Sequence, residues 1–279
     1  MNYKIGIIGV GFVGGAVKKY FESKNIKPLV YDKYKQLGSI EEVNKADIVF
    51  VCVPTPFLPP KGFDSSCVKS AIKILKSPKI VVIKSSVIPG TIDNLQKKFS
   101  QHKIMFNPEF LREISAYEDF IHPDREIIGT TEKSKKLAKQ ILKILPKAPF
   151  EKIMPAKETE MVKYMANSFL ALKVVYANQF YDLCKKLKLN YEDVRIAVGE
   201  DKRICHSHLD VSHGGYRGFG GSCFPKDVNA IIQLAERLKV DISLLKTMKE
   251  INLKLLKQSG LSEEYFLLEK HKQKSPKNF

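Results

Sequence analysis

Short apolar runs alternate with amphipathic segments through the first half of the chain. These runs have the length and composition of buried strands, and they cover residues 4–8, 28–31, 47–53, 79–84, 103–106 and 126–129. Helical patterns stand between the earlier runs, over residues 16–21, 65–75 and 92–99. Because strands that alternate with helices build a parallel sheet covered on both faces, the pattern predicts an α/β fold with a doubly wound parallel sheet.

The second half of the chain has helical patterns. One long helix is predicted from Pro155 to about Leu187, and apolar side chains occur on almost every side of it. Such a helix is buried, inside one domain or between two subunits, so we expect a homodimer that covers it. We therefore predict a sheet domain at 1–152, an all-α domain built on the long helix at 153–260, and a loosely held basic tail at 261–279.

Composition narrows the classes of partner. The formal charge is +17, but lysines are spread along the chain and no basic cluster alternates with stacking aromatics, so no nucleic-acid partner is expected. A phosphate-bearing substrate or cofactor fits the charge equally well. No apolar run reaches membrane-spanning length and no secretory signal precedes Tyr3, so we expect a cytoplasmic protein without membrane contact. The five cysteines lack paired C-x-x-C spacing, and no metal site is predicted.

A glycine-rich loop follows the first predicted strand. The segment Gly9-Val10-Gly11-Phe12-Val13-Gly14 has the pattern G-x-G-x-x-G and leads into a helix. Its first glycine allows a tight turn, and its second lets a pyrophosphate reach the amides of the helix N-terminus. The second strand ends at Asp32, where an acid accepts hydrogen bonds from ribose hydroxyls and repels a 2′-phosphate. The sequence thus predicts a Rossmann-like domain that binds NAD.

The run from Gly220 to Asp227 combines two glycines with Cys223, Pro225 and Lys226. A nearby cation or a helix N-terminus favours the thiolate form of a cysteine, and a thiolate attacks carbonyl carbon. A lone cysteine is more often a small buried apolar residue, so both interpretations stay open on this run alone.

Lys163 and Asn167 are spaced i, i+4 on the long helix. A buried, paired lysine in such a place can act as an acid or base, whereas a lysine that extends its methylenes to the surface has no such role. The spacing does not decide between the two. Polar loops also follow three predicted strands, at residues 54–56, 85–91 and 107–113, where a doubly wound sheet binds its ligands.

Taken in chain order, these motifs resemble those of the nucleotide-sugar 6-dehydrogenases, the UDP-glucose, UDP-N-acetyl-mannosamine and GDP-mannose dehydrogenase family. The resemblance covers residues 3 to about 257, and its most specific part is the run 218–227. The matching segments are 9–14 with Asp32, 53–56, 84–91, 107–113, 123–125, 163–170 and 218–227.

The resemblance implies a four-electron oxidation of a sugar C6 alcohol to a carboxylate, with two NAD and a cysteine. Lys163 with Asp227 and a water would take the hydroxyl proton, and Cys223 would form a thiohemiacetal and then a thioester. Glu113 would activate water, Asn167 and Lys163 would stabilise the oxyanion, and Thr91 and Glu109 would orient water. NAD would contact Gly9, Gly11, Phe12, Val13, Gly14, Asp32, Thr55 and Thr91. The substrate would contact Phe110, Leu111, Lys163, Asn167, Arg217 and Gly220.

UDP-glucose, oxidised to UDP-glucuronate, is the default substrate that the resemblance implies. Members of the family carry a further Rossmann-like domain after the second amphipathic helix, so we expect a shortened form of the family. One alternative is a single-step oxidoreductase similar to the β-hydroxyacid dehydrogenases, which the Cys223 motif disfavours. Another alternative is a non-catalytic NAD-binding remnant of the family.

Overall fold

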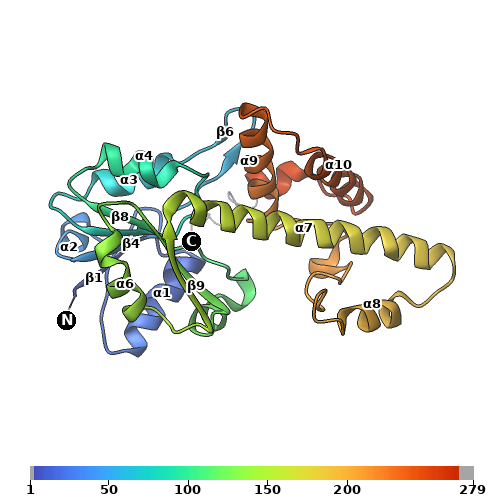
Figure 1. The fold of residues 1–279 in the computed structure, drawn as a ribbon, viewed down its shortest axis with the longest axis horizontal. Helices are drawn as coiled ribbons and strands as arrows, with labels where there is room; N and C mark the ends of the chain where they lie inside the picture. Colours follow the sequence, from blue (N-terminus) through green and yellow to red (C-terminus); the bar gives the residue numbers. More distant parts are fainter. Residues whose placement is uncertain (1–2, 270–279) are drawn as a thin grey trace. The chain divides into compact units, whose positions relative to one another are not determined.

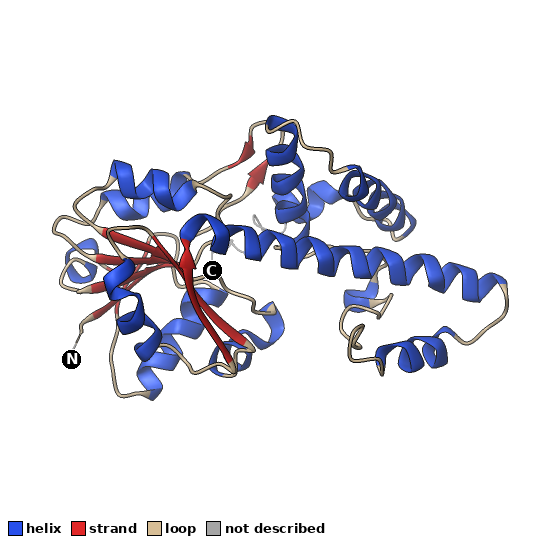
Figure 2. Cartoon of the chain, viewed as in Figure 1, coloured by secondary structure: helices blue, strands red, loops and turns tan. Residues whose placement is uncertain are grey.

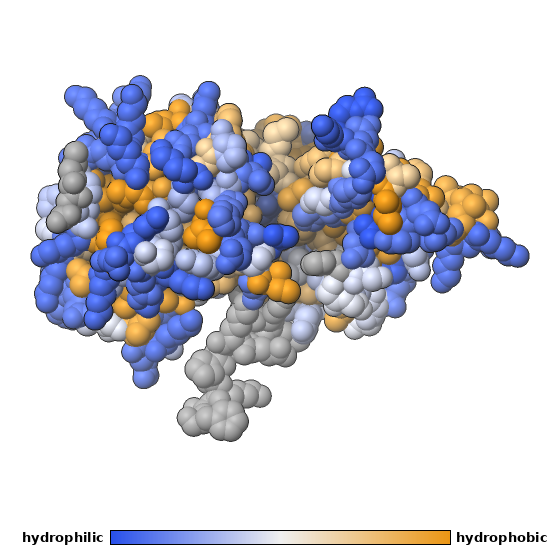
Figure 3. All heavy atoms as spheres, turned by 90° about the horizontal axis from the view of Figure 1, so that it is seen from below, coloured by the Kyte–Doolittle hydropathy of each residue, from blue (hydrophilic) through white to orange (hydrophobic). Residues whose placement is uncertain are grey.

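The computed structural model describes residues 3–269 and contains two compact units (Figure 1). The first unit holds the residues before Phe57 together with Asp64–Lys163, and the second holds Phe57–Phe63 and the residues from Tyr164 onward. The boundary between the two units falls within one long helix, between Lys163 and Tyr164. In the described residues, no helix is both long and apolar enough to cross a membrane. On the face drawn in Figure 3, hydrophilic side chains are interspersed with apolar areas.

One sheet of eight strands organises the first unit within the described residues. Its order is β10-β9-β8-β7-β4-β1-β2-β3. The strands are β1 Ile5–Ile8, β2 Leu29–Asp32, β3 Leu37–Gly38, β4 Ile48–Val51, β7 Ile80–Ile83, β8 Lys103–Phe106, β9 Arg125–Thr130 and β10 Phe150–Pro155. The five central strands β2, β1, β4, β7 and β8 are parallel, which confirms the predicted doubly wound sheet.

Strands β3 and β10 were not predicted from the pattern. Both are at sheet edges, and β10 is half-exposed to exposed along its length, so its sequence contains no continuous apolar run. Strand β9 pairs antiparallel with β8 and parallel with β10. The start of β9 at Arg125 therefore lies at the same edge of the sheet as the carboxyl ends of the central strands.

Helices cover the sheet of the first unit (Figure 2). They are α1 Phe12–Ser23, α2 Ile40–Val43, α3 Ser66–Lys73, α4 Thr91–Lys98, α5 Ala116–Ile121 and α6 Ala138–Ile144, with short 3-10 turns η1 Glu113–Ser115 and η2 Lys135–Leu137. Strand residues Ile7, Phe50 and Met105 are fully buried and belong to one apolar cluster with Val17 and Phe21 of α1. The amphipathic face of α1 thus fixes the glycine loop ahead of it against the sheet.

The second unit is mostly helical, as predicted. Its elements are α7 Ala156–Lys186, whose first two turns lie in the first unit, α8 Tyr191–Gly199, α9 Phe224–Arg237 and α10 Ser243–Gln258, with 3-10 turn η3 His213–Gly215. A small hairpin, β5 Phe57–Leu58 and β6 Gly62–Phe63, packs against α9. The core joins Val175 of α7, Val228 of α9 and Met248 of α10 around Phe219.

One face of α7 is exposed in the single chain. Tyr164 and Val175 are 1% and 2% exposed, whereas Met165 is 73% and Phe169 59% exposed. The expectation that the helix is buried within one domain is therefore wrong for this face. Burial between two subunits, the other expectation, stays a prediction.

The predicted loose tail at 261–279 is wrong for its first residues. Phe266 and Leu267, in η4 (Tyr265–Glu269), are 2% and 4% exposed, and the ring centroids of Phe266 and Tyr216 are 5.3 Å apart. The Glu263 carboxylate accepts a hydrogen bond from Asn229 Nδ2 at 2.8 Å. Apolar burial and this polar contact fix a segment whose charged neighbours suggested a solvated tail. Residues 270–279 lie outside the described residues.

Candidate active site

The glycine loop has the geometry that a dinucleotide requires. Gly9 has φ +87°, and a Cβ there would stand 2.6 Å from the Cys52 carbonyl oxygen. A Cβ at Gly14 would be 1.9 Å from the Gly9 oxygen, so only glycine closes this turn against the end of β4. A Cβ at Gly11 would have nothing within 4 Å, so it faces open space at the start of α1.

Asp32 lies beside this loop at the end of β2 and is 9% exposed. Its Oδ2 accepts from the Val10 amide at 2.7 Å, and its Oδ1 accepts from the amides of Tyr34 and Lys35 at 3.0 Å. Lys35 Nζ donates to the Val10 carbonyl oxygen at 2.6 Å. The acid is thus held next to the loop, and the helix N-terminus has no side-chain cap or acidic first turn that would compete with a phosphate. These residues fit NAD, whose pyrophosphate and ribose they would hold.

Two threonines predicted to contact the cofactor hold loops at the carboxyl ends of neighbouring strands. Thr55, after β4, donates from Oγ1 to the Ser86 carbonyl oxygen at 2.8 Å and is buried. Thr91, the first residue of α4, donates from Oγ1 to the Ile88 carbonyl oxygen at 2.6 Å. The Thr55 hydroxyl therefore joins the loop after β4 to the loop after β7, and the Thr91 hydroxyl closes a turn within the loop after β7.

Glu160 of α7 caps α4, a role that the sequence did not reveal. It is fully buried, and its two carboxylate oxygens accept from the amides of Gly90 at 2.5 Å and Ile92 at 2.8 Å. Burial raises the pKa of the Glu160 carboxyl to about 7, against the lowering effect of these amides. In the sequence Glu160 follows Lys157, Glu158 and Thr159 in the polar start of the long helix, so its residue type and position did not mark it as a cap.

Lys163 is buried and paired, which excludes the alternative that it extends to the surface. It is 3% exposed, and its ammonium donates to Glu109 at Oε1 (2.9 Å) and at the backbone oxygen (2.6 Å). Glu109 is 6% exposed and also accepts from the Leu111 amide at 2.9 Å. The structure thus joins two predicted catalytic residues in one buried ion pair.

Two cations lie close to the ring of Phe110. Lys163 Nζ is 5.4 Å from its ring centroid, and the Arg125 guanidinium carbon is 3.9 Å from it. The Nε of Arg125 is buried without a hydrogen-bond partner among the described residues, and burial lowers the pKa of Arg125. The family resemblance includes Arg125 in the segment 123–125 without a catalytic or binding role, and the structure places it beside Phe110.

A second group of buried charged and polar side chains holds the loop that carries Glu109. Lys84 Nζ donates to Asn107 Oδ1 at 2.6 Å, and Asn107 Nδ2 donates to a Glu126 carboxylate oxygen. All three side chains are at most 5% exposed. Burial lowers the pKa of Lys84 and raises that of Glu126. Asn107 therefore bridges two buried charges and anchors the loop that carries Glu109.

Glu113 differs from these residues because it is exposed, in η1. Its neighbour Arg112 forms a two-armed ion pair with Asp119, and these hydrogen bonds hold the pKa of Asp119 below its usual range. The predicted water-activating role of Glu113 stays a prediction.

In the second unit, Cys223 is the N-cap residue of α9 and is half-buried. Asp227 is 1% exposed, and its carboxylate accepts from Asn167 Nδ2 at 2.5 Å and from Lys226 Nζ. By contrast, Cys184 is 5% exposed, and desolvation raises the pKa of the Cys52 thiol to about 12. Those two cysteines fit the packing interpretation, whereas Cys223 lies where a helix N-terminus favours negative charge.

The residues predicted to contact substrate in this unit are held by structural partners. The Arg217 guanidinium donates to Asn178 Oδ1 at 2.9 Å and to both oxygens of Asp182, at 2.7 and 3.0 Å. A Cβ at Gly220 would stand 2.5 Å from atoms of Phe266 and Tyr216. Arg217 therefore anchors its loop to α7, and its contact with substrate stays a prediction.

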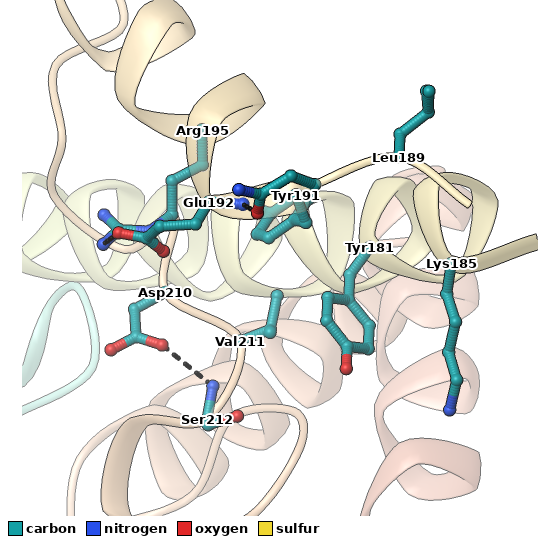
Figure 4. Close-up of a pocket in the computed structure, with 10 residues that line it drawn as sticks. Tyr181, Lys185, Leu189, Tyr191, Glu192, Arg195, Asp210, Val211 and Ser212 are labelled. Atoms are coloured by element: carbon teal, nitrogen blue, oxygen red, sulfur yellow. Dashed lines mark hydrogen bonds and ion pairs between the residues drawn. The ribbon is translucent and has the colours of Figure 1, made fainter. Parts of the chain in front are cut away.

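A pocket of about 390 Å³ lies elsewhere in the second unit (Figure 4). It is formed by the end of α7, the start of α8 and the segment 210–212, with Tyr181 and Tyr191 packed edge to face at 5.5 Å. None of the predicted site residues lines it. In the described part of the chain, no group of three or more metal-ligating side chains is found.

Comparison with known proteins places these features in context. The NAD-binding domain of the UDP-glucose/GDP-mannose dehydrogenase family matches residues 32–146, and the central domain of the same family matches residues 157–254. The glycine loop precedes the matched range, so its assignment depends on its geometry.

Individual relatives agree. The chain is 36% identical to UDP-glucose 6-dehydrogenase of Rickettsia prowazekii in an alignment of 221 residues that covers 76% of this chain and 50% of the relative. It is 37% identical to the Pseudomonas aeruginosa protein of that name, over 76% of this chain and 49% of the relative. The chain thus spans about half the length of these curated relatives. A solved UDP-glucose dehydrogenase from Pyrobaculum islandicum superposes with a TM-score of 0.80 at 30% identity, over 93% of this chain and 71% of the other.

Proposed function

Because the chain belongs to the UDP-glucose/GDP-mannose dehydrogenase family, we propose that it oxidises the C6 alcohol of a nucleotide sugar to a carboxylate, with UDP-glucose as the first substrate to test. The observation that carries the proposal is Cys223 at the N-terminus of α9, four residues before a buried Asp227. The product would be UDP-glucuronate, formed by loss of two hydrides. NAD, when bound at the glycine loop, accepts each hydride.

The first step needs a base for the C6 hydroxyl proton. Lys163 and Asp227 would take this proton through a water that they share. The buried Glu109 carboxylate holds the Lys163 side chain in one place, because it accepts from the ammonium at 2.9 Å. With the proton gone, the C6 carbon can release its hydride and become an aldehyde.

The second step needs a nucleophile. The Cys223 sulfur would form a bond to the aldehyde carbon, and the carbonyl oxygen would become the hydroxyl of a thiohemiacetal. Loss of a second hydride and of that hydroxyl proton gives a thioester on Cys223. Water activated by Glu113 would then attack the thioester carbon and release the carboxylate, and the sulfur would leave as thiolate. Asn167 and Lys163 would donate to the oxyanion of both tetrahedral states, a contribution of about 3 kcal/mol in comparable sites.

A homodimer is the second part of the proposal. Met165, Phe169, Tyr176, Phe180 and Leu183 of α7 are 43–73% exposed and recur at intervals of three, four and seven residues, so they form one apolar stripe along the helix. A second copy of this chain, with the same stripe, would cover it symmetrically.

The test is a panel of UDP- and GDP-sugars with NAD, followed by NADH absorbance. We expect two NADH for each sugar oxidised, and a covalent sugar adduct on Cys223 by mass spectrometry of quenched reactions. In Cys223→Ser the adduct and the carboxylate product should be lost. One NADH per substrate, unchanged in Cys223→Ser, would favour the single-step alternative. NAD binding without turnover of any sugar would favour a non-catalytic member of the family.

A further inference from the structure

We propose that Asn252 of α10 is a positioning residue for Cys223, an inference that rests on the proposed role of Cys223 as nucleophile. Asn252 is 33 residues beyond Phe219 in the sequence and is 1% exposed. Its Oδ1 accepts from the Phe219 amide at 2.6 Å, and its Nδ2 donates to the Phe219 carbonyl oxygen at 3.0 Å. One side chain thus satisfies both polar groups of a buried backbone residue, as a neighbouring strand would.

The segment between this contact and the nucleophile has little stiffness of its own. It consists of Gly220, Gly221 and Ser222, and Gly221 has φ +77° with open space where a Cβ would be. Glycines have a wide range of backbone conformations, so they do not hold Cys223 in place themselves. The position of the sulfur therefore depends on what holds the segment from outside. Gly220 packs closely against Phe266 and Tyr216, and the two ends are held by the Phe219 peptide groups and by the first turn of α9.

Gly218 allows the contact to form. It has φ +85°, and a Cβ there would stand 2.5 Å from Asn252 Oδ1 and 3.2 Å from Leu255 Cβ. The Phe219 ring packs in the core of the second unit with Val228 and Met248, which fixes the side chain but not the peptide groups. The Asn252 amide supplies the missing constraint on the backbone.

A positioning role makes a specific prediction about the thiol. If Asn252 holds Cys223 at the N-terminus of α9, its loss should remove the local stabilisation of the thiolate. We would measure the rate of carboxamidomethylation of Cys223 by iodoacetamide in the full chain, across pH, by mass spectrometry. Exposed Cys205 provides an internal reference in the same sample.

In Asn252→Ala the rate at Cys223 should fall by about tenfold near neutral pH, because a displacement of about 1 Å is enough to lose a positioned contact. At about pH 10, where an ordinary thiol is ionised, variant and parent should react alike. Gly218→Ala should behave in the same way, since its Cβ displaces the Asn252 oxygen. Asn252→Asp keeps the acceptor for the Phe219 amide and should retain part of the rate.

Asn44→Ala is the matched control. The Asn44 side chain also bonds backbone groups of two segments, donating to the Ile40 and Ile74 oxygens at 2.8 and 3.0 Å and accepting from the Lys76 amide, all in the first unit. It should cost similar stability without altering the rate at Cys223. If Cys223 of the parent reacts faster than Cys205, and the rate at Cys223 near neutral pH is unchanged or higher in Asn252→Ala, the positioning role of Asn252 is overturned while the role of Cys223 is not. If the parent chain is carboxamidomethylated no faster at Cys223 than at Cys205, both the proposed role of Cys223 as nucleophile and the positioning role of Asn252 are overturned.

Discussion

The ammonium of Lys163 and the carboxylate of Glu109 form an ion pair of 2.9 Å in which both side chains are at most 6% exposed. The two residues are 54 positions apart, and the pair joins α7 to the loop after β8. A buried pair of this kind fixes the direction of both side chains, and a catalytic base needs a fixed direction.

Glu109→Gln should lower kcat by about a hundredfold with a smaller change in KM, because it removes the charge that holds Lys163 but keeps a similar shape. Initial rates of NADH formation with the best nucleotide sugar would measure this. Glu118→Gln, an exposed acid on α5, is the control and should leave kcat unchanged. Equal rates in Glu109→Gln and the parent would remove Glu109 from the site.

The buried group of Lys84, Asn107 and Glu126 predicts that substitutions of its two charged residues have non-additive effects on the free energy of unfolding. Lys84→Met alone should cost about 3–5 kcal/mol, because it leaves a buried acid without its nearest cation. The double variant Lys84→Met with Glu126→Gln removes both charges and should cost less than the single variant. Urea unfolding of the singles and the double gives the coupling energy, and additive losses would contradict the bridge through Asn107.

The sequence predicted what depends on neighbouring residues. The central strands are continuous apolar runs, and the glycine loop and the Cys223 run carry their chemistry in a few consecutive positions. The loop around Glu109 could be placed at a strand end from the alternation of strands and helices alone. These predictions needed no knowledge of contacts between distant segments.

The rest depends on contacts between distant segments. Nothing within a few residues of Lys163 shows that Glu109 would pair with it, so surface exposure stayed open until the structure excluded it. Asn252 falls on the apolar face of its helix, in line with Met248 and Leu255, but the sequence does not show that its amide pairs with the backbone of Phe219. Phe266 belongs to a stretch rich in charge, and only its packing against Tyr216 and Gly220 shows that the segment is held.

The apolar stripe of α7 predicts a dimer that one charge would disrupt. Phe169→Asp places a carboxylate in the middle of the stripe, where Phe169 is 59% exposed in the single chain. Since a charge buried between two copies is strongly disfavoured, we expect the variant to sediment as a monomer while the parent sediments as a dimer. Leu238→Asp is the control, because Leu238 is 64% exposed but lies outside α7. A parent that sediments as a monomer at micromolar concentration would contradict the proposal.

The cap that Glu160 forms on α4 predicts how stability depends on pH. Because the pKa of Glu160 is raised from 4.5 to about 7, the folded chain holds this proton more tightly than the unfolded chain. The stability that this proton adds to the folded chain is therefore fully present below pH 4.5 and is lost as the pH rises through about 7. The difference between the two pKa values corresponds to about 3 kcal/mol in the free energy of unfolding.

Glu160→Gln has no proton to release at this position, so its stability should not show this fall. The unfolding free energy of the parent minus that of Glu160→Gln should decrease by about 3 kcal/mol between pH 4.5 and about pH 8. Urea unfolding at fixed ionic strength over this range would measure it. Glu158→Gln, an exposed acid in the same turn of α7, should give a constant difference from the parent. A constant difference for Glu160→Gln as well would mean that Glu160 is already ionised at pH 4.5, and that the amides of Gly90 and Ile92 outweigh its burial.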